Sequence, residues 1–219
     1  MTHKHLHTAE DGITRCWWGK DHLDYRNYHD VEWGRPVSKD FRLFEKICLE
    51  GFQSGLSWLS ILRKRENFRH AFAGFDFNKI TGFDDNNVSQ LLQNSGIIRH
   101  RGKIEATINN AQRALELVEE FGSLAAYIWG WEPASPEPHI GKGEYSHPIP
   151  SITRTSQLLS KDLKNRGWEF IGPTTAYAFM QAMGLVNDHM EGCGIREIVE
   201  SMRSEFEPPK QQFFRQSSD

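Results

Sequence analysis

The sequence lacks several features that would place it in a specialised class of protein. No apolar run approaches the ~20 residues needed to cross a bilayer. Residues 1–12 are polar and rich in histidine, without the apolar core of a signal peptide. Only three cysteines occur in 219 residues, and they are widely spaced, so they do not make a disulfide framework. We therefore expect a cytoplasmic protein with no membrane partner.

The chain also lacks an excess of charge of one sign. Its net charge of -3 gives no global basic field that would attract nucleic acid. Three local basic clusters stand out, at Arg63 to Arg65, Arg99 to Lys103 and Lys161 to Arg166. For any one of them, a solvated helix face is the simpler interpretation. The seven tryptophans are a high count and suggest a site where flat rings are stacked.

Period-two alternation with β-branched residues is missing, whereas helical periodicity is strong. The apolar spacing predicts helices over 41–50, 56–72, 103–121, 157–166 and 174–183, several of them ending at a glycine. Residues 130–151 are rich in Pro, Gly and Ser and predict a long loop. We predict an all-α domain over 16–196, with a flexible extension at 1–15. A second extension at 197–219 is expected to be disordered from Glu207 onward.

Two pairs of residues with metal-binding side chains lie near the ends of this domain. Cys16 and His29 form one pair, and His189 and Cys193, about one helical turn apart, form the other. Thiolate and imidazole are the ligands that zinc prefers. The pairs are 159 residues apart, so spacing alone does not join them, and buried thiols with ordinary histidines fit as well. Cys48, on an apolar helix face, is interpreted as core.

Residues 158–183 indicate two helices joined by a short turn. Gly167 and Gly172 allow a tight reversal, and Pro173 fits the first turn of the second helix, with Thr174 or Thr175 as its cap. Unpaired N–H groups at that helix start would suit a phosphate, flanked by Lys161, Lys164 and Arg166. An ordinary helical packing unit is about as consistent with this spacing. Arg99 and Lys103 mark a second, weaker candidate contact.

Several strings of residues together resemble one family. The strings are Cys16-Trp17-Trp18, Tyr25, Tyr28-His29-Asp30 with Glu32-Trp33-Gly34, residues 49–58, 64–68 and 96–103, Phe170 to Thr175, and Gly184 to His189. They are similar to DNA-3-methyladenine glycosylase I, over Cys16 to Cys193. The resemblance implies the helix-hairpin-helix glycosylase fold. It also implies one structural zinc held by Cys16, His29, His189 and Cys193.

The resemblance further implies a substrate and a base pocket. The family removes 3-methyladenine from alkylated double-stranded DNA, leaving an abasic site. Alkylation at N3 makes the base cationic and weakens its glycosidic bond, so the enzyme has to flip and hold the base rather than protonate it. The family's pocket falls on Glu50 as the carboxylate. Its surrounding rings fall on Trp18, Tyr28, Trp33 and Trp58, with Tyr25 as a second-rank candidate.

Further expectations follow from single positions. The stretch Pro173 to Ala176 lacks the nucleophilic lysine of bifunctional relatives, which predicts a monofunctional enzyme. We expect Asp188 to orient His189 rather than to act in catalysis. Phe52 and the loop 130–151 are candidates for influencing substrate range, and a monomer is expected. The alternative function is a non-enzymatic, zinc-stabilised module that binds damaged DNA. A zinc hydrolase is disfavoured because four protein ligands leave no open position.

Overall fold

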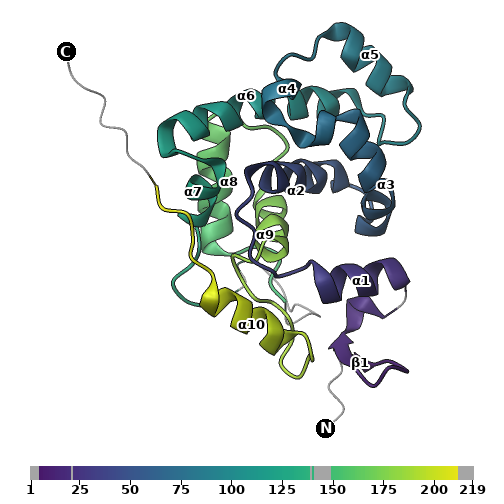
Figure 1. Cartoon of the computed structure of the whole chain (residues 1–219), viewed down its shortest axis with the longest axis vertical. Coiled ribbons are helices and arrows are strands. Elements are labelled where there is room, and N and C mark those ends of the chain that lie inside the picture. The colour runs from purple at the N-terminus through teal and green to yellow at the C-terminus, as the bar shows by residue number, and fades with distance from the viewer. Residues whose placement is uncertain (1–4, 21, 139, 141–148, 212–219) are drawn as a thin grey trace, which may run out of the picture.

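The computed structural model describes residues 5–20, 22–138, 140 and 149–211 of the chain (Figure 1). The described part is mainly helical, with one two-stranded antiparallel sheet. Its elements are β1 (Leu6–Thr8), β2 (Thr14–Cys16), the 3-10 helix η1 (Trp17–Gly19), α1 (Leu23–Val31), α2 (Asp40–Gln53), α3 (Trp58–Ala71), η2 (Ala73–Phe75), α4 (Phe77–Ile80), α5 (Asp85–Gln93), α6 (Arg101–Phe121), α7 (Leu124–Trp129), α8 (Arg154–Asn165), α9 (Pro173–Ala182) and α10 (Arg196–Glu205).

The five helices predicted from periodicity correspond to α2, α3, α6, α8 and α9. Their ends follow local chemistry. Helix α3 begins two residues later than expected because Ser57 caps it, accepting from the backbone N–H of Ser60. Helix α6 ends at Gly122, whose φ of 87° is the left-handed conformation that glycine favours. The remaining helices, α1, α4, α5, α7 and α10, have ten residues or fewer and were not predicted.

Helix α2 is the centre of the core. Every residue from Leu43 to Phe52 is buried, because α3, α6, α7 and α9 all pack against it. Phe52 lies against Phe68 and Phe72, with ring centroids 4.6 Å and 5.9 Å away. Phe52 is therefore part of the core, and it does not line the candidate base pocket described below. In Figure 1, α2 and α9 lie side by side in the middle of the molecule.

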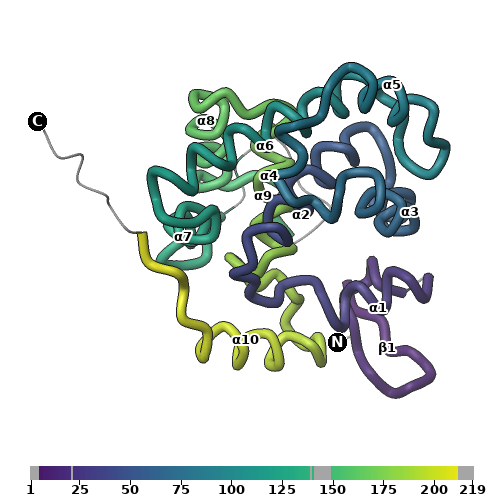
Figure 2. The backbone as a smooth tube through the Cα atoms, turned by 45° about the horizontal axis from the view of Figure 1, so that its top comes forward, coloured from purple at the N-terminus to yellow at the C-terminus, as the bar shows by residue number. Residues whose placement is uncertain are grey.

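Segments from the two ends of the chain meet on one side of this core. The β1–β2 hairpin and the start of α10 lie near each other in both Figure 1 and Figure 2, and the backbone N–H of Gly194 donates to the carbonyl of Thr14 at 2.8 Å. Parts of both expected extensions are thus ordered. Val199 of α10 is fully buried, and Phe206 packs on Trp129 with centroids 4.4 Å apart. Residues 212–219 and most of the loop 139–148 lie outside the described residues.

The predicted helix–turn–helix pair is present as α8 and α9. Gly167, with φ of 83°, and Phe170, with φ of 58°, turn the chain between them. Both the N–H and the carbonyl of Glu169 are bound by the Asn110 amide, at 2.8 Å and 3.0 Å. The expected threonine cap of α9 is wrong: Gly172 is the N-cap, Pro173 is the first helical residue, and no side chain caps this end.

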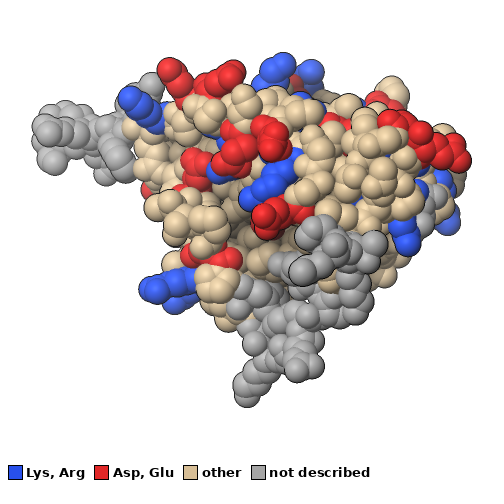
Figure 3. All heavy atoms as spheres, turned by 90° about the horizontal axis from the view of Figure 1, so that it is seen from below, with Lys and Arg blue, Asp and Glu red and all other residues tan. Residues whose placement is uncertain are grey.

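None of the helices in the described ranges is long and apolar enough to span a bilayer. On the face shown in Figure 3, basic and acidic side chains are interspersed. This distribution agrees with the small net charge, so any attraction of DNA has to come from local groups.

Candidate base pocket and metal centre

The four metal-binding residues singled out in the sequence form one buried cluster. Their ligand atoms all lie within 4.8 Å of one another. His29 Nε2 is 3.2 Å from His189 Nδ1, and the Cys193 sulfur is 3.6 Å and 3.7 Å from those two nitrogens. A tetrahedral zinc ion would separate two nitrogens by about 3.3 Å and a nitrogen from a sulfur by about 3.6 Å. These residues therefore fit a metal ion bound by two nitrogens and two sulfurs.

The groups around the cluster orient its ligands. His29 Nδ1 is 2.8 Å from Asp30, and Arg15 binds the same carboxylate through two nitrogens at 2.8 Å and 2.9 Å. Burial acts in the opposite direction, but donation from Arg15 and His29 lowers the pKa of Asp30. The hydrogen bond from the Cys16 thiol lowers the pKa of Cys193, which favours the thiolate form that binds metals.

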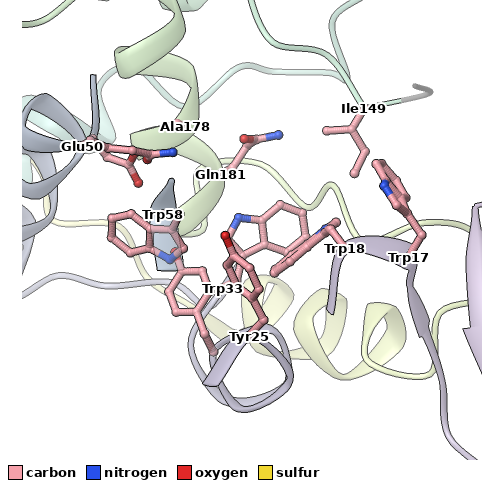
Figure 4. A pocket seen from close by; sticks show the side chains of 11 residues that line it. Trp17, Trp18, Tyr25, Trp33, Glu50, Trp58, Ile149, Ala178 and Gln181 are labelled. Carbon is pink, nitrogen blue, oxygen red and sulfur yellow. The ribbon is translucent and has the colours of Figure 1, made fainter. Parts of the chain in front are cut away.

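A cavity of about 390 Å³ opens next to this cluster, within the range of small-molecule sites. Figure 4 shows Glu50 and Trp58 at one end and Trp17 with Ile149 at the other. Helix α9 contributes Ala178 and Gln181. The lining residues are Trp17, Trp18, Tyr25, Tyr28, Trp33, Glu50, Gln53, Trp58, Ile149, Ala178 and Gln181. The predicted carboxylate and all five predicted rings are thus brought together.

The rings of the pocket pack against one another, with Trp18 edge to face against Trp33 and Tyr25. The ring centroids of Trp18 and Trp33 are 4.9 Å apart, and the two ring planes meet at an angle of 81°. The hydroxyl of Tyr25 accepts from the backbone N–H of Leu59, in the first turn of α3. Among the described residues, the buried indole N–H of Trp58 has no hydrogen-bond partner. The pocket is therefore aromatic, with one acid at its end.

That acid, Glu50, is buried and paired. Its side chain is 6% exposed, and its Oε1 lies 2.6 Å from the ammonium of Lys46, one helical turn earlier on α2. The same ammonium donates to the hydroxyl of Tyr28 at 2.8 Å. Burial, with the nearby charges of Glu50 and Glu32, raises the pKa of Tyr28 well above its ordinary value. Tyr28 therefore stays a neutral phenol. The sequence analysis had missed Lys46.

The chain is similar to known proteins over most of its length. The family described as methyladenine glycosylase matches residues 17–197. DNA-3-methyladenine glycosylase 1 of Escherichia coli is 45% identical over 181 residues, which is 83% of this chain and 96% of that protein. The chain belongs to the methyladenine glycosylase family. The DNA-3-methyladenine glycosylase of Haemophilus influenzae is also 45% identical, over 82% of this chain and 96% of its own length.

Solved structures of this glycosylase family share the fold. A crystal structure of 3-methyladenine DNA glycosylase I superposes with a TM-score of 0.74 at 46% identity, covering 82% of this chain and 98% of that one. A structure of 3-methyladenine DNA glycosylase I from Staphylococcus aureus, described as the structural basis of 3-methyladenine recognition, superposes with a TM-score of 0.75 at 33% identity. The match covers 82% of this chain and 94% of that one. The resemblance drawn from the sequence is confirmed.

The role expected for Asp188 in this family member is wrong. Its Oδ2 accepts from the hydroxyl of Tyr177 at 2.7 Å and from the amide of Gln181 at 2.8 Å. His189 Nε2 instead lies 3.1 Å from the backbone carbonyl of Trp33. Asp188 therefore holds a pocket residue, Gln181, rather than a ligand. This pairing could not be predicted from the residue pattern, because it depends on how α9 meets the loop after it.

The predicted phosphate contacts fall into two groups. Lys103 is 8% exposed, and its ammonium donates to the carbonyls of Phe52 at 2.9 Å and Ser54 at 2.7 Å. Arg166 is held by Asp162 and Glu120 at 2.7 Å and 2.6 Å. Both cations thus have partners within the protein, Lys103 in a buried position and Arg166 with a side chain that is 29% exposed, and a contact of either with DNA stays a prediction. Arg99, Lys164, Gly167 and Thr174 are exposed.

The turn between α8 and α9 lies close to the start of α6. The ring of Phe170 is 6.1 Å from that of His100, which caps α6 by accepting from the N–H of Lys103. A side chain at Gly51, next to Glu50, would meet Phe170 at 3.5 Å. The two helix N-termini singled out in the sequence are therefore near each other, beside the end of α2 that carries Glu50.

Proposed function

We propose that this chain is a monofunctional DNA glycosylase that hydrolyses the bond between 3-methyladenine and deoxyribose in alkylated double-stranded DNA. The observation that carries the proposal is the burial of a single carboxylate, Glu50, at the end of a cavity walled by aromatic rings. A flat, electron-poor base suits rings that can stack on it and a carboxylate that can accept hydrogen bonds from its edge. Simple binding of phosphates would require neither feature.

The pocket has to supply little chemical activation of the leaving base. The base cation is already a good leaving group, so the rate depends on extruding the nucleotide and stabilising the sugar as positive charge moves onto it. Rings such as Trp18 and Trp58 replace the stacking that the base loses on leaving the helix. Glu50 binds the polar edge of the base and adds a negative charge that favours the transition state.

The backbone of the DNA would lie along the two neighbouring helix starts. The N-terminus of α9 has no side-chain cap, so its first N–H groups are available to a phosphate oxygen. Lys164 and Arg99 are among the exposed cations on the segments beside them. Such contacts carry no sequence information, as a repair enzyme requires. The assignment of α8 and α9 as a helix-hairpin-helix motif is part of this proposal.

Zinc is the metal that we assign to Cys16, His29, His189 and Cys193. Two sulfurs and two nitrogens complete its preferred tetrahedron, which leaves no position for water or substrate. Its contribution is therefore structural. It would link the end of β2 and helix α1 to the loop before α10 and hold the ends of the chain together.

The test is release of free base from methylated duplex DNA. Wild-type protein should release 3-methyladenine and leave an intact abasic site, and Glu50→Gln should slow release by 10- to 1,000-fold while the fold is retained. Binding of methylated DNA without any base release would instead support the damage-binding module. Full activity in Glu50→Gln would remove the role given to the carboxylate.

A further inference from the structure

A buried lysine stands behind the wall of the base pocket. Lys46 does not line the pocket itself but a neighbouring cavity of about 150 Å³, which shares Tyr28 and Trp58 with it. Its side chain is 7% exposed. The ammonium nitrogen lies 2.6 Å from Glu50 Oε1, 2.8 Å from the Tyr28 hydroxyl and 3.3 Å from the centroid of the Trp58 ring.

These three contacts match the three N–H bonds of an ammonium group. One is directed to a carboxylate, one to a phenol oxygen and one to the face of an aromatic ring. With all three engaged, Lys46 is held in place and is not presented to the pocket as a nucleophile. The stability of α2 does not explain this lysine either, because lysine four residues before glutamate is the weaker order of such a pair.

The surrounding charges are balanced among themselves. Arg65 of α3 binds Glu32 through two nitrogens at 2.5 Å and 2.8 Å. Glu45 is held by Arg42 and Arg69, each at 2.8 Å. Among the described residues, Lys46 is the cation that contacts Glu50.

We propose that Lys46 is a positioning and specificity residue: it fixes one oxygen of Glu50 and keeps the carboxylate ionised, so that the other oxygen meets the base as a pure hydrogen-bond acceptor. This inference rests on the proposed function. An ionised carboxylate accepts but cannot donate. It therefore favours a base edge with an amino group, as in adenine, over one with a carbonyl oxygen, as in guanine.

The ionisation of Lys46 agrees with this role near neutral pH. Burial lowers the pKa of Lys46 to about 8, against the opposing effect of Glu50. Below that pH the ammonium is charged, and the pair as a whole is neutral. Without it, Glu50 would be a buried negative charge with no partner, and such a group takes up a proton more readily.

The test is the pH profile of base release under single-turnover conditions in Lys46→Met, which keeps the length and apolar stem of the side chain. We expect the acid limb for 3-methyladenine to move to higher pH by about one unit or more. At pH values below the new limb, the ratio of 3-methyladenine to 3-methylguanine released should fall. Lys79→Met removes the same charge from a side chain that is 70% exposed, and it should keep the wild-type profile.

Two further variants separate this role from simple structural support. Lys46→Met should not move the profile when Glu50→Gln is already present, and Lys46→Arg should restore the wild-type limb. An unchanged profile in Lys46→Met, or the same shift in the Glu50→Gln background, would overturn the proposal. If Lys46→Met does not fold, Lys46→Gln is used instead. An unchanged profile, or the same shift in the Glu50→Gln background, would then overturn the proposal in the same way. Failure of the proposed function is distinct, because wild-type protein would then release no base at all.

Discussion

The imidazole of His29 lies edge-on to the indole of Trp18, with ring centroids 5.0 Å apart. His189 contacts Trp33 in the same way at 4.7 Å. Two candidate metal ligands are thus in direct contact with two walls of the base pocket. A metal at this centre would fix those rings as well as the ends of the chain.

Metal removal is therefore expected to lower the stability of the fold and, as a consequence, the affinity of the pocket for the base. We predict one zinc per chain by elemental analysis, with chelation lowering the melting temperature and weakening the binding of free 3-methyladenine. Cys193→Ala should lose the metal and show the same effects. Cys48→Ala is the matched control, because the thiol of Cys48 is buried in the core of α2 and should leave the zinc content unchanged. Full zinc retention in Cys193→Ala would contradict the assignment.

Lys103 and Arg99 should behave differently although both belong to one basic cluster. Lys103→Met leaves the carbonyls of Phe52 and Ser54 without their donor, so we expect it to lower the unfolding free energy by about 1–3 kcal/mol. Arg99→Met should leave stability within about 0.5 kcal/mol and weaken DNA binding, with a smaller salt dependence. Urea unfolding and salt titrations of DNA affinity measure the two effects. A Lys103→Met variant with unchanged stability and weakened DNA binding would show instead that Lys103 contacts DNA.

The contrast between these two residues shows what the sequence could predict. Helical periodicity identified α2, α3, α6, α8 and α9, and the pocket rings and the metal ligands followed from the resemblance to the family. The interaction partners of the charged side chains could not be predicted from either source. Lys46 and Lys103 are both lysines in helical segments, which sequence alone assigns to solvent, and only tertiary packing directs their ammonium groups to Glu50 and to the end of α2.

Asp188 illustrates the same limit from the acidic side. Its place next to His189 in sequence suggested that the two side chains interact, but the carboxylate binds Tyr177 and Gln181 of α9. Adjacent residues outside regular structure commonly direct their side chains apart. Gln181 itself carries no sequence signal, since a glutamine near the end of a helix is usually exposed.

Lys46 should also affect the pH dependence of stability. Its pKa is about 8 in the folded protein and 10.5 when unperturbed. Between those values the unfolded chain binds the proton and the folded protein does not, so the unfolding free energy rises with pH. From pH 7 to 9.5, wild type should gain roughly 2 kcal/mol relative to Lys46→Met. Urea unfolding of both proteins at the two pH values measures the difference, and the raised pKa of Tyr28 largely cancels in it. A constant difference would show that the ammonium is not desolvated.

The proposed monofunctional chemistry predicts that no covalent enzyme–DNA intermediate forms. The first turn of α9 contains Pro173, Thr174 and Thr175, and the three N–H bonds of Lys46 are engaged behind the pocket wall. Borohydride added during turnover should therefore trap no adduct, and the DNA strand should stay uncut until the abasic site is cleaved by alkali. An adduct lost in Lys46→Met would identify that lysine as a nucleophile.

The central claim is that the aromatic pocket with Glu50 releases 3-methyladenine from DNA. The most direct measurement is a single-turnover assay on methylated duplex DNA in which the freed bases are separated and quantified for wild type and Glu50→Gln. We predict that wild type releases 3-methyladenine and that Glu50→Gln, in a protein that stays folded at the assay temperature, does so at least 10-fold more slowly. Folded wild-type protein that binds this DNA but frees no base would contradict the account.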